Sequence, residues 1–285
     1  MKKILLLGQS GFIGQNLLEY FQEKYDIIAP THQQLDVLDE RAVIDCLSKG
    51  NFDIVINALD VRDGSIDYFE KRLRMFTNLA THHNLYGKML YFGSGAEYGK
   101  QKDIVQVSED DFGQVIPSDT YGLCMYTMQQ LASQLPNVYN FRLFGIFGKY
   151  EIWQRRFISN AICKAIYGFP ITIRQNTKFD YLFIDDLCKM VAYFIENKMK
   201  YQNYNATSGR IYELYELAQI VKETVGLDYP IFVAKDGYGL EYTSNNDRIV
   251  KEIRLDIEEI MHSINQLTKW YQNHRKQICL GQLLY

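Results

Sequence analysis

The sequence predicts an α/β protein in which helices cover both faces of a doubly wound parallel sheet. Short apolar runs alternate with longer segments of helical period through the first half of the chain, and a glycine-rich turn links the first run to the first periodic segment. The chain has 285 residues, 47% of them hydrophobic, so it can bury a sizeable core. Crossover connections bring the carboxyl ends of the strands to one edge, where a ligand is expected.

The apolar runs and the periodic segments give the expected elements in chain order. Strands are expected at residues 3–7, 25–29, 53–58, 89–92 and 138–144. Helices are expected between them at residues 11–24, 40–49, 65–84 and 120–135; Gly50 closes the second and Pro136 stops the fourth. Further helices are expected at residues 157–167, 185–197, 213–225 and 257–273.

Residues 94–119 form an unusually long connection with little regular pattern. Loops of this length in compact domains are usually functional or disordered. The chain contains no Pro- or Gly-rich linker, internal repeat or low-complexity tract. Any second domain is therefore expected to be interleaved with the first.

Charge and cysteine content argue against several classes of partner. The 31 Lys and Arg residues are balanced by 34 Asp and Glu, and no basic stripe suggests binding to nucleic acid or to a membrane surface. The apolar run at residues 4–7 is too short for a signal peptide or a membrane span. Five cysteines without a Cys-x-x-Cys pair suit a reducing compartment, so we expect a cytoplasmic protein. No residues stand at metal-chelating spacing, and no metal site is predicted.

The strongest local signal is the turn after the first strand, where Gly8, Gly11 and Gly14 stand three residues apart before an amphipathic helix. Such glycines permit a tight turn, the approach of a pyrophosphate to backbone N–H groups, and close packing of helix on strand. The alternative is a tight turn that binds nothing. We predict a Rossmann-type dinucleotide-binding domain at residues 1–150, to which residues 177–207 return. Residues 151–176 and 208–285 are predicted to form a smaller α/β substrate-binding domain.

The end of the second strand bears on the choice of dinucleotide. NAD-binding units usually place an Asp or Glu there, which bonds the adenosine ribose. Here no carboxylate follows the strand until Asp36. NADP(H) is therefore favoured. NAD(H) stays the alternative, because no arginine stands there to bind a 2′-phosphate and the nearest donors are Thr31, His32 and two glutamines.

Several motifs in order resemble those of the extended short-chain dehydrogenases/reductases, which are largely nucleotide-sugar epimerases, dehydratases and 4-ketoreductases. The glycine turn matches the cofactor turn of that family, and the run Gly-Ser-Gly-Ala-Glu-Tyr-Gly at residues 93–99 resembles its strand-end serine motif. Tyr121-Gly122 resembles its catalytic tyrosine motif. Residues 141–148, 179–186 and 204–206 are similar to later family segments, so the likeness covers nearly the whole chain.

The resemblance implies that the Ser94 hydroxyl and the Tyr121 phenol converge on a sugar carbonyl. In that family a lysine four residues after the tyrosine lowers the pKa of the phenol, and here that position is Met125. Without a nearby cation, the pKa of Tyr121 is expected near its ordinary value of about 10, so the phenol stays protonated at neutral pH. A protonated phenol still serves ketone reduction, whereas alcohol oxidation needs a phenolate base. Met125 is equally compatible with packing alone.

The resemblance also implies the positions of the ligand contacts and the assembly. A homodimer built on the helices of residues 65–84 and 120–135 is expected. Contacts to a nucleoside-diphospho sugar are expected at Ser94, Glu97, Tyr98, Phe147, Arg155, Arg156 and Tyr181. Cofactor contacts are expected at Gly8, Ser10, Gly11, Phe12, Ile13, Gly14, Thr31, His32, Asp36, Val37, Asn57, Ala58, Tyr121 and Phe144.

Three functions follow, in order of preference. The first is NADP(H)-dependent reduction of a 4-keto nucleoside-diphospho sugar by an NAD(P)-dependent oxidoreductase. The second is a nucleotide-sugar epimerase or dehydratase. The third is a catalytically inactive homologue, natural or engineered, that binds the dinucleotide only; Met125 is the residue that supports it.

Overall fold

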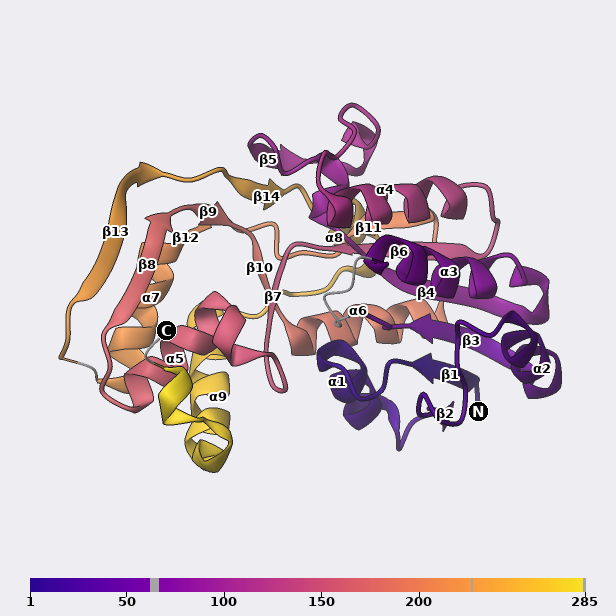
Figure 1. The fold of residues 1–285 in the computed structure, drawn as a ribbon, viewed down its shortest axis with the longest axis horizontal. Helices are drawn as coiled ribbons and strands as arrows, with labels where there is room; N and C mark the ends of the chain where they lie inside the picture. Colours follow the sequence, from indigo (N-terminus) through magenta and orange to yellow (C-terminus); the bar gives the residue numbers. More distant parts are fainter. Residues whose placement is uncertain (62–66, 227, 284–285) are drawn as a thin grey trace.

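The computed structural model describes residues 1–61, 67–226 and 228–283. Its larger part is built on a six-stranded sheet in the order β11-β6-β4-β3-β1-β2 (Figure 1), and every strand pair in it is parallel. Strand order reverses between β1 and β3, as the predicted Rossmann-type fold requires. The strands are β1 (Lys3–Leu7), β2 (Asp26–Ile28), β3 (Phe52–Asn57), β4 (Tyr86–Ser94), β6 (Val138–Leu143) and β11 (Asn203–Asn205).

Alternate residues of β1 show that both faces of this sheet are covered. Ile4 and Leu6 belong to one hydrophobic cluster, and Leu5 and Leu7 belong to another; all four are at most 2% exposed. Because side chains alternate across a strand, the two clusters lie on opposite faces. The helices of this part are α1 (Phe12–Phe21), α2 (Glu40–Gly50), α3 (Tyr68–Ala80), α4 (Thr120–Ala132) and α6 (Ile184–Glu196).

The second group of elements gathers away from the sheet, on the left of Figure 1. It has two small sheets, in which β8 pairs with β13 and β9 joins β12 to β14, and the strands β7 and β10 lie between the two groups. Its helices are α5 (Phe157–Ile166), α7 (Leu214–Val225) and α9 (Ile260–Asn273). Helix α8 (Asp247–Ile253) lies instead beside β11 of the larger part. The strands of the second group are β7 (Gly145–Phe147), β8 (Ile171–Asn176), β9 (Lys178–Phe179), β10 (Tyr181–Phe183), β12 (Tyr212–Glu213), β13 (Ile231–Tyr238) and β14 (Tyr242–Ser244).

The long connection at residues 94–119 is ordered by a distant part of the chain. It contains β5 (Ile104–Val107), which pairs in parallel with β14, and Tyr242 stands opposite Ile104. Strand pairing across more than a hundred residues leaves no local periodicity, which is why the sequence showed no pattern there. The pairing brings Tyr242 to the end of β4, where its hydroxyl lies 3.4 Å from that of Ser94.

The observed elements confirm the expected strands and helices with shifts of a few residues at their ends. The largest shift is in α3, which spans Tyr68–Ala80 and so ends four residues before the expected end at position 84. Residues 65 and 66 of the expected helix lie outside the described residues, as do positions 62–66, 227 and 284–285 of the two expected domains. The division into domains stays a prediction. Within the described ranges, no helix has the length and apolar character that a membrane span requires.

Candidate functional site

The glycine turn after β1 packs directly against the end of β3. Gly8 has a φ of 85°, and a Cβ atom there would lie 2.4 Å from the carbonyl oxygen of Ala58. Only glycine combines this backbone conformation with so close an approach. Gly11 closes the turn by donating its N–H to the carbonyl oxygen of Gly8 at 2.9 Å. The turn is thus fixed in contact with the neighbouring strand.

The amino terminus of α1 is prepared for an anion. Gly11 is its N-cap residue and offers no side chain, and the first turn holds no acidic residue. The first N–H groups of a helix lack partners inside the helix and carry a partial positive charge. A pyrophosphate fits this position, so the residues present agree with a bound dinucleotide.

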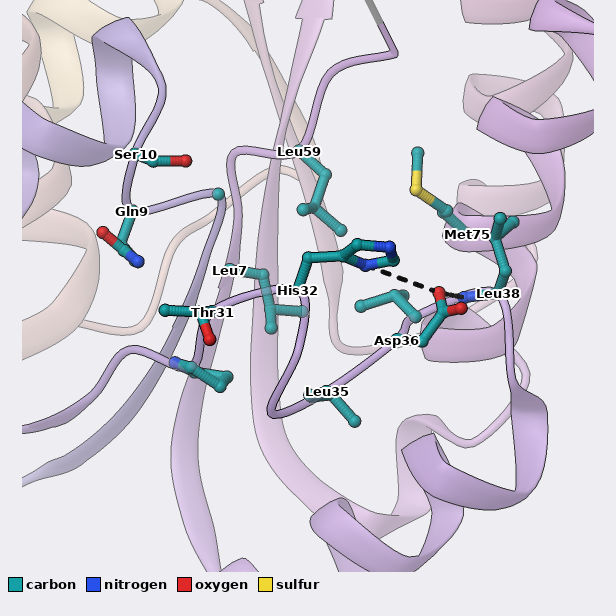
Figure 2. Close-up of a pocket in the computed structure, with 13 residues that line it drawn as sticks. Leu7, Gln9, Ser10, Thr31, His32, Leu35, Asp36, Leu38, Leu59 and Met75 are labelled. Atoms are coloured by element: carbon teal, nitrogen blue, oxygen red, sulfur yellow. Dashed lines mark hydrogen bonds and ion pairs between the residues drawn. The ribbon is translucent and has the colours of Figure 1, made fainter.

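A pocket of about 240 Å³ extends from this turn over the end of β2 (Figure 2). His32 and Asp36, both from the segment after β2, point toward one another at this pocket, with 3.8 Å between Nδ1 and Oδ1. The Asp36 carboxylate also accepts the N–H of Leu38 at 3.0 Å. Six of the expected cofactor residues line this pocket: Gly8, Ser10, Thr31, His32, Asp36 and Val37.

A second pocket, of about 310 Å³, adjoins the first at Leu59, which lines both. It lies at the carboxyl edge of the sheet, because Asn57 ends β3 and Ser94 ends β4. Six more expected cofactor residues line it, together with Ser94: Phe12, Ile13, Asn57, Ala58, Tyr121 and Phe144. The fold therefore gathers twelve of the fourteen expected cofactor residues into one groove, while Gly11 and Gly14 form the turn and first helical residues beside it.

Ser94 is held by its own short turn. Its backbone N–H donates to Glu97 Oε1 at 3.0 Å, and its hydroxyl accepts the N–H of Ala96 at 3.2 Å. The hydroxyl oxygen also lies 3.4 Å from the Tyr242 hydroxyl. Burial raises the pKa of Tyr242 well above its ordinary value, so this phenol is protonated and able to hydrogen-bond to Ser94.

Tyr121 enters the same pocket from the first turn of α4. The Asp119 carboxylate caps that helix by accepting the N–H of Gly122 at 2.8 Å. A Cβ atom on Gly122 would lie 2.8 Å from the carbonyl oxygen of Ala96, so the glycine lets α4 approach the serine turn closely. This approach explains why a glycine follows the tyrosine.

The Tyr121 phenol is less acidic than expected from the sequence. The residue is 37% exposed, yet loss of water around its hydroxyl raises its pKa above the ordinary value. The positive charge of Arg72 and a hydrogen bond with Ser94 oppose that rise, and the negative charges of Asp60 and Glu97 add to it. At neutral pH the phenol is therefore protonated.

Met125 makes no charged contribution to the pocket. Its side chain is 1% exposed and belongs to the hydrophobic cluster that also holds Cys124 and Met128. The packing interpretation of this residue agrees with its surroundings. Position 125 therefore supplies no positive charge in place of the lysine that the resemblance led us to expect there.

Four charged or hydroxyl-bearing residues of the second pocket were not predicted from the sequence: Asp60, Arg72, Lys100 and Tyr242. Arg72 stands in a run of charged residues on α3 that is typical of a solvated face, but its side chain is only 9% exposed. Tyr242 is one of 22 tyrosines and is brought to the site by β14, which pairs with both β5 and β9. Lys100 directly follows the serine motif, and this position could have identified it as a candidate site residue.

Three of the expected substrate contacts are not among the residues that line the second pocket, and their role stays a prediction. Glu97 is fully buried and its carboxylate is paired with Arg142, so it contacts protein groups. Tyr98 is 5% exposed and donates its hydroxyl to Asn205 at 2.9 Å. Phe147 is 1% exposed and packs between Tyr181 and Phe183.

Of the three remaining residues that were expected to contact the substrate, one lines the second pocket and two do not. Arg156 lines the second pocket beside Ser94 and Tyr121. Arg155 is exposed and Tyr181 packs against Phe147 and Phe179, and neither is among the residues that line the pocket. In the described part of the chain, no three His, Cys, Asp or Glu side chains are placed to hold a metal ion.

Comparison with known proteins agrees with this geometry. The model of the NAD dependent epimerase/dehydratase family matches residues 4–207. The chain belongs to this family. Membership confirms the resemblance that the motifs indicated and the predicted class of NAD(P)-dependent enzyme.

Similar proteins act on nucleotide sugars. GDP-L-colitose synthase of Yersinia pseudotuberculosis is 23% identical over 253 residues, which cover 79% of this chain and 82% of that protein. The structure of dTDP-glucose 4,6-dehydratase from Bacillus anthracis in complex with NAD has a TM-score of 0.81 at 16% identity and covers 97% of this chain and 98% of its own. A GDP-mannoheptose C4 reductase from Campylobacter jejuni, with NADP bound, has a TM-score of 0.78 at 17% identity, covering 95% and 98%.

The buried pair of Glu97 and Arg142 yields a prediction about stability. Both side chains are fully buried, so Arg142→Met leaves the Glu97 carboxylate without its counter-charge. We expect the free energy of unfolding, measured by urea denaturation, to fall by about 3 to 5 kcal/mol. The double variant Glu97→Gln/Arg142→Met is expected to lose less, because it leaves no uncompensated charge. Equal losses in the two variants would contradict this account of the pair.

Proposed function

We propose that the protein reduces a ketone at C4 of a nucleoside-diphospho sugar with NADP(H). The observation that carries the proposal is that Ser94 and a protonated Tyr121 line one pocket, while the residue four positions after Tyr121 is the buried Met125 and not a lysine. This set of groups suits the donation of a proton better than its removal.

The chain's own groups account for the proton side of the reaction. When bound, a reduced nicotinamide supplies the hydride that the carbonyl carbon accepts. The Ser94 hydroxyl donates a hydrogen bond to the carbonyl oxygen and so polarises the C=O bond. The Tyr121 phenol then gives its proton to that oxygen, which leaves an alcohol on the sugar and a phenolate on the protein.

The same groups are less suited to the opposite reaction, oxidation of a sugar alcohol. An epimerase or a dehydratase of this family begins by oxidising its substrate, which needs a phenolate as base. Burial raises the pKa of Tyr121, so that base is scarce near pH 7. The phenol as found is thus ready for reduction without any prior change of protonation state.

The first pocket supports NADP(H) as the cofactor. The Asp36 carboxylate is engaged by the N–H of Leu38, and β2 itself ends without an acidic residue. The His32 side chain is 80% exposed at the rim of the pocket, where a 2′-phosphate would meet it and Thr31. One similar structure, the C4 reductase, also carries NADP.

The second pocket offers two cations for the diphosphate of the substrate. Lys100 and Arg156 both line it, next to the proposed catalytic pair. Loss of water lowers the pKa of the Lys100 ammonium although the residue as a whole is exposed, and its Nζ atom lies 4.5 Å from the centre of the Tyr242 ring. Such a cation gains most from a phosphate partner. The homodimer expected from the family stays a prediction.

The roles of Tyr121 and Ser94 give a test of activity. Tyr121→Phe removes the proton donor and is expected to lower kcat for reduction of a 4-keto sugar by about 10² to 10⁴. Ser94→Ala removes the polarising hydroxyl and should lower it by roughly 10². NADPH consumption measures both. Tyr126→Phe is the matched control, because it removes a phenol from the same helix as Tyr121 that lines neither pocket.

The same assay also separates the proposed reduction from the two alternative functions. If the native protein binds NADPH but turns over no keto sugar, and Met125→Lys does not create activity, the chain is a binding-only homologue. Interconversion of nucleotide sugars without net NADPH consumption would favour an epimerase. Either result overturns the proposed reduction.

The cofactor preference yields a separate prediction. His32→Asp places a carboxylate where the 2′-phosphate is expected, so it should weaken NADPH binding and strengthen NADH binding through the ribose hydroxyls. We expect the ratio of the two Kd values to change by roughly tenfold or more. His32→Asn is the control, since it removes the imidazole without adding charge. An unchanged ratio in His32→Asp would show that the 2′-position lies elsewhere.

A further inference from the structure

We propose that Arg72 of α3 takes the place of the missing lysine and stabilises the phenolate that Tyr121 becomes when it gives up its proton. The inference rests on the proposed role of Tyr121 in the reaction. It makes Arg72 a positioning residue that acts through the phenol, from a helix other than the one that carries Tyr121.

The geometry places the guanidinium beside the phenol ring. The Cζ atom of Arg72 lies 5.8 Å from the centre of the Tyr121 ring and 5.9 Å from the centre of the Tyr68 ring. The two tyrosine rings are 6.4 Å apart. Arg72 also lines the second pocket together with Ser94 and Tyr121. The charge is therefore inside the candidate active site.

Burial makes this charge effective and keeps it in place. The Arg72 side chain is 9% exposed, so water screens its charge little. Its Nη1 atom donates to Oδ1 of Asp60, which anchors the guanidinium, and within the described ranges its Nε–H has no hydrogen-bond partner. An arginine stays protonated at every pH at which the enzyme works. It is a permanent charge that takes no part in proton transfer itself.

The arrangement of α3 and α4 explains how the exchange of residues is tolerated. A lysine at position 125 would reach the phenol from the same helix, one turn after Tyr121. Here Met125 fills the hydrophobic cluster instead, beside Cys124, and the cation arrives from α3, which packs against α4. The cation beside Tyr121 thus comes from α3, and not from position 125 of α4, the helix that carries the tyrosine.

The electrostatic surroundings of the phenol agree with this role. Burial raises the pKa of Tyr121 most, and among the charged groups around it Arg72 acts most strongly to lower it. Asp60 from the β3 end and Glu97 from the serine turn act against Arg72, and the phenols of Tyr68 and Tyr242 also face Tyr121. Ser94 lowers the pKa by a hydrogen bond. Of the groups that act most strongly on this phenol, Arg72 is the one that carries a positive charge. Lys100 and Arg156 line the same pocket but do not figure among those groups.

The test measures the ionisation of Tyr121 directly, in the protein without cofactor. The protein is labelled with fluorotyrosine, whose phenol is more acidic than that of tyrosine, and the resonance of residue 121 is assigned by its absence in Tyr121→Phe. We then follow its pH titration by fluorine NMR in three variants: Arg72→Gln, Arg72→Lys and Asp60→Asn. Urea denaturation of each variant confirms that it is folded at the pH values used.

The three variants separate an electrostatic role from a structural one. Arg72→Gln removes the positive charge, so the pKa of residue 121 should rise. Asp60→Asn breaks the same ion pair but removes a negative charge, so that pKa should fall. Arg72→Lys should leave it close to the native value. A pKa unmoved in Arg72→Gln, or one that moves in the same direction in Arg72→Gln and Asp60→Asn, would overturn the proposal.

A second cation offers an independent check through the reaction. We expect Arg72→Gln to lower kcat/KM for ketone reduction by roughly tenfold or more, and Met125→Lys to restore most of that loss in the double variant. In the native background Met125→Lys should add little, because one cation is already present. If the titrations behave as expected while Tyr121→Phe stays fully active, the charge assignment stands and the proposed role of Tyr121 fails. The two failures are thus distinguishable.

Discussion

The backbone contact between Gly8 and Ala58 is the constraint on which the candidate site depends. It brings the first turn of the fold against the end of β3, with no room for a Cβ atom between the two chains. That contact aligns the uncapped start of α1 with the polar end of β3 and makes one groove of two adjoining pockets. The groove is built from main-chain groups of neighbouring parallel strands, so its position follows from the topology of the sheet.

A second set of contacts fixes Ser94, one of the two residues that we propose to act on the substrate, relative to that groove. Glu97 and Arg142 pair inside the protein, and the same carboxylate accepts the N–H of Ser94. From the opposite side, β14 brings Tyr242 to within 3.4 Å of the Ser94 hydroxyl. Ser94 is thereby held by its own turn, which Arg142 of β6 anchors through Glu97, and by Tyr242 of β14. Buried partners of this kind restrict the hydroxyl to a narrow range of positions, as proton transfer requires.

The sequence was most informative where the chemistry is local. Periodicity or spacing within a short segment was enough to predict the strands, the glycine turn and the Ser94 and Tyr121 motifs. The structure places Ser94 and Tyr121 in one pocket at the carboxyl edge of the sheet. The sequence was least informative where a residue acts through a distant partner. Glu97 stood inside a recognisable motif, but its burial against Arg142 depends on the pairing of β4 with β6.

Arg72 illustrates the same limit from the other side. In the sequence it is one charge among several on an amphipathic helix, a pattern typical of solvent exposure. Only the packing of α3 on α4 shows that this charge is buried beside two phenol rings. The missing lysine at position 125 was readable as a departure from the family, but the group that compensates for it was not, because no spacing rule connects residues on different helices.

The central claim is that this groove binds a dinucleotide through the glycine turn and the start of α1. Calorimetric titration of the native protein with NADPH and with NADH tests it most directly. The account predicts one binding site per chain, with tighter binding of NADPH than of NADH. Absence of binding for both dinucleotides would contradict it, and with it every functional role assigned to the groove.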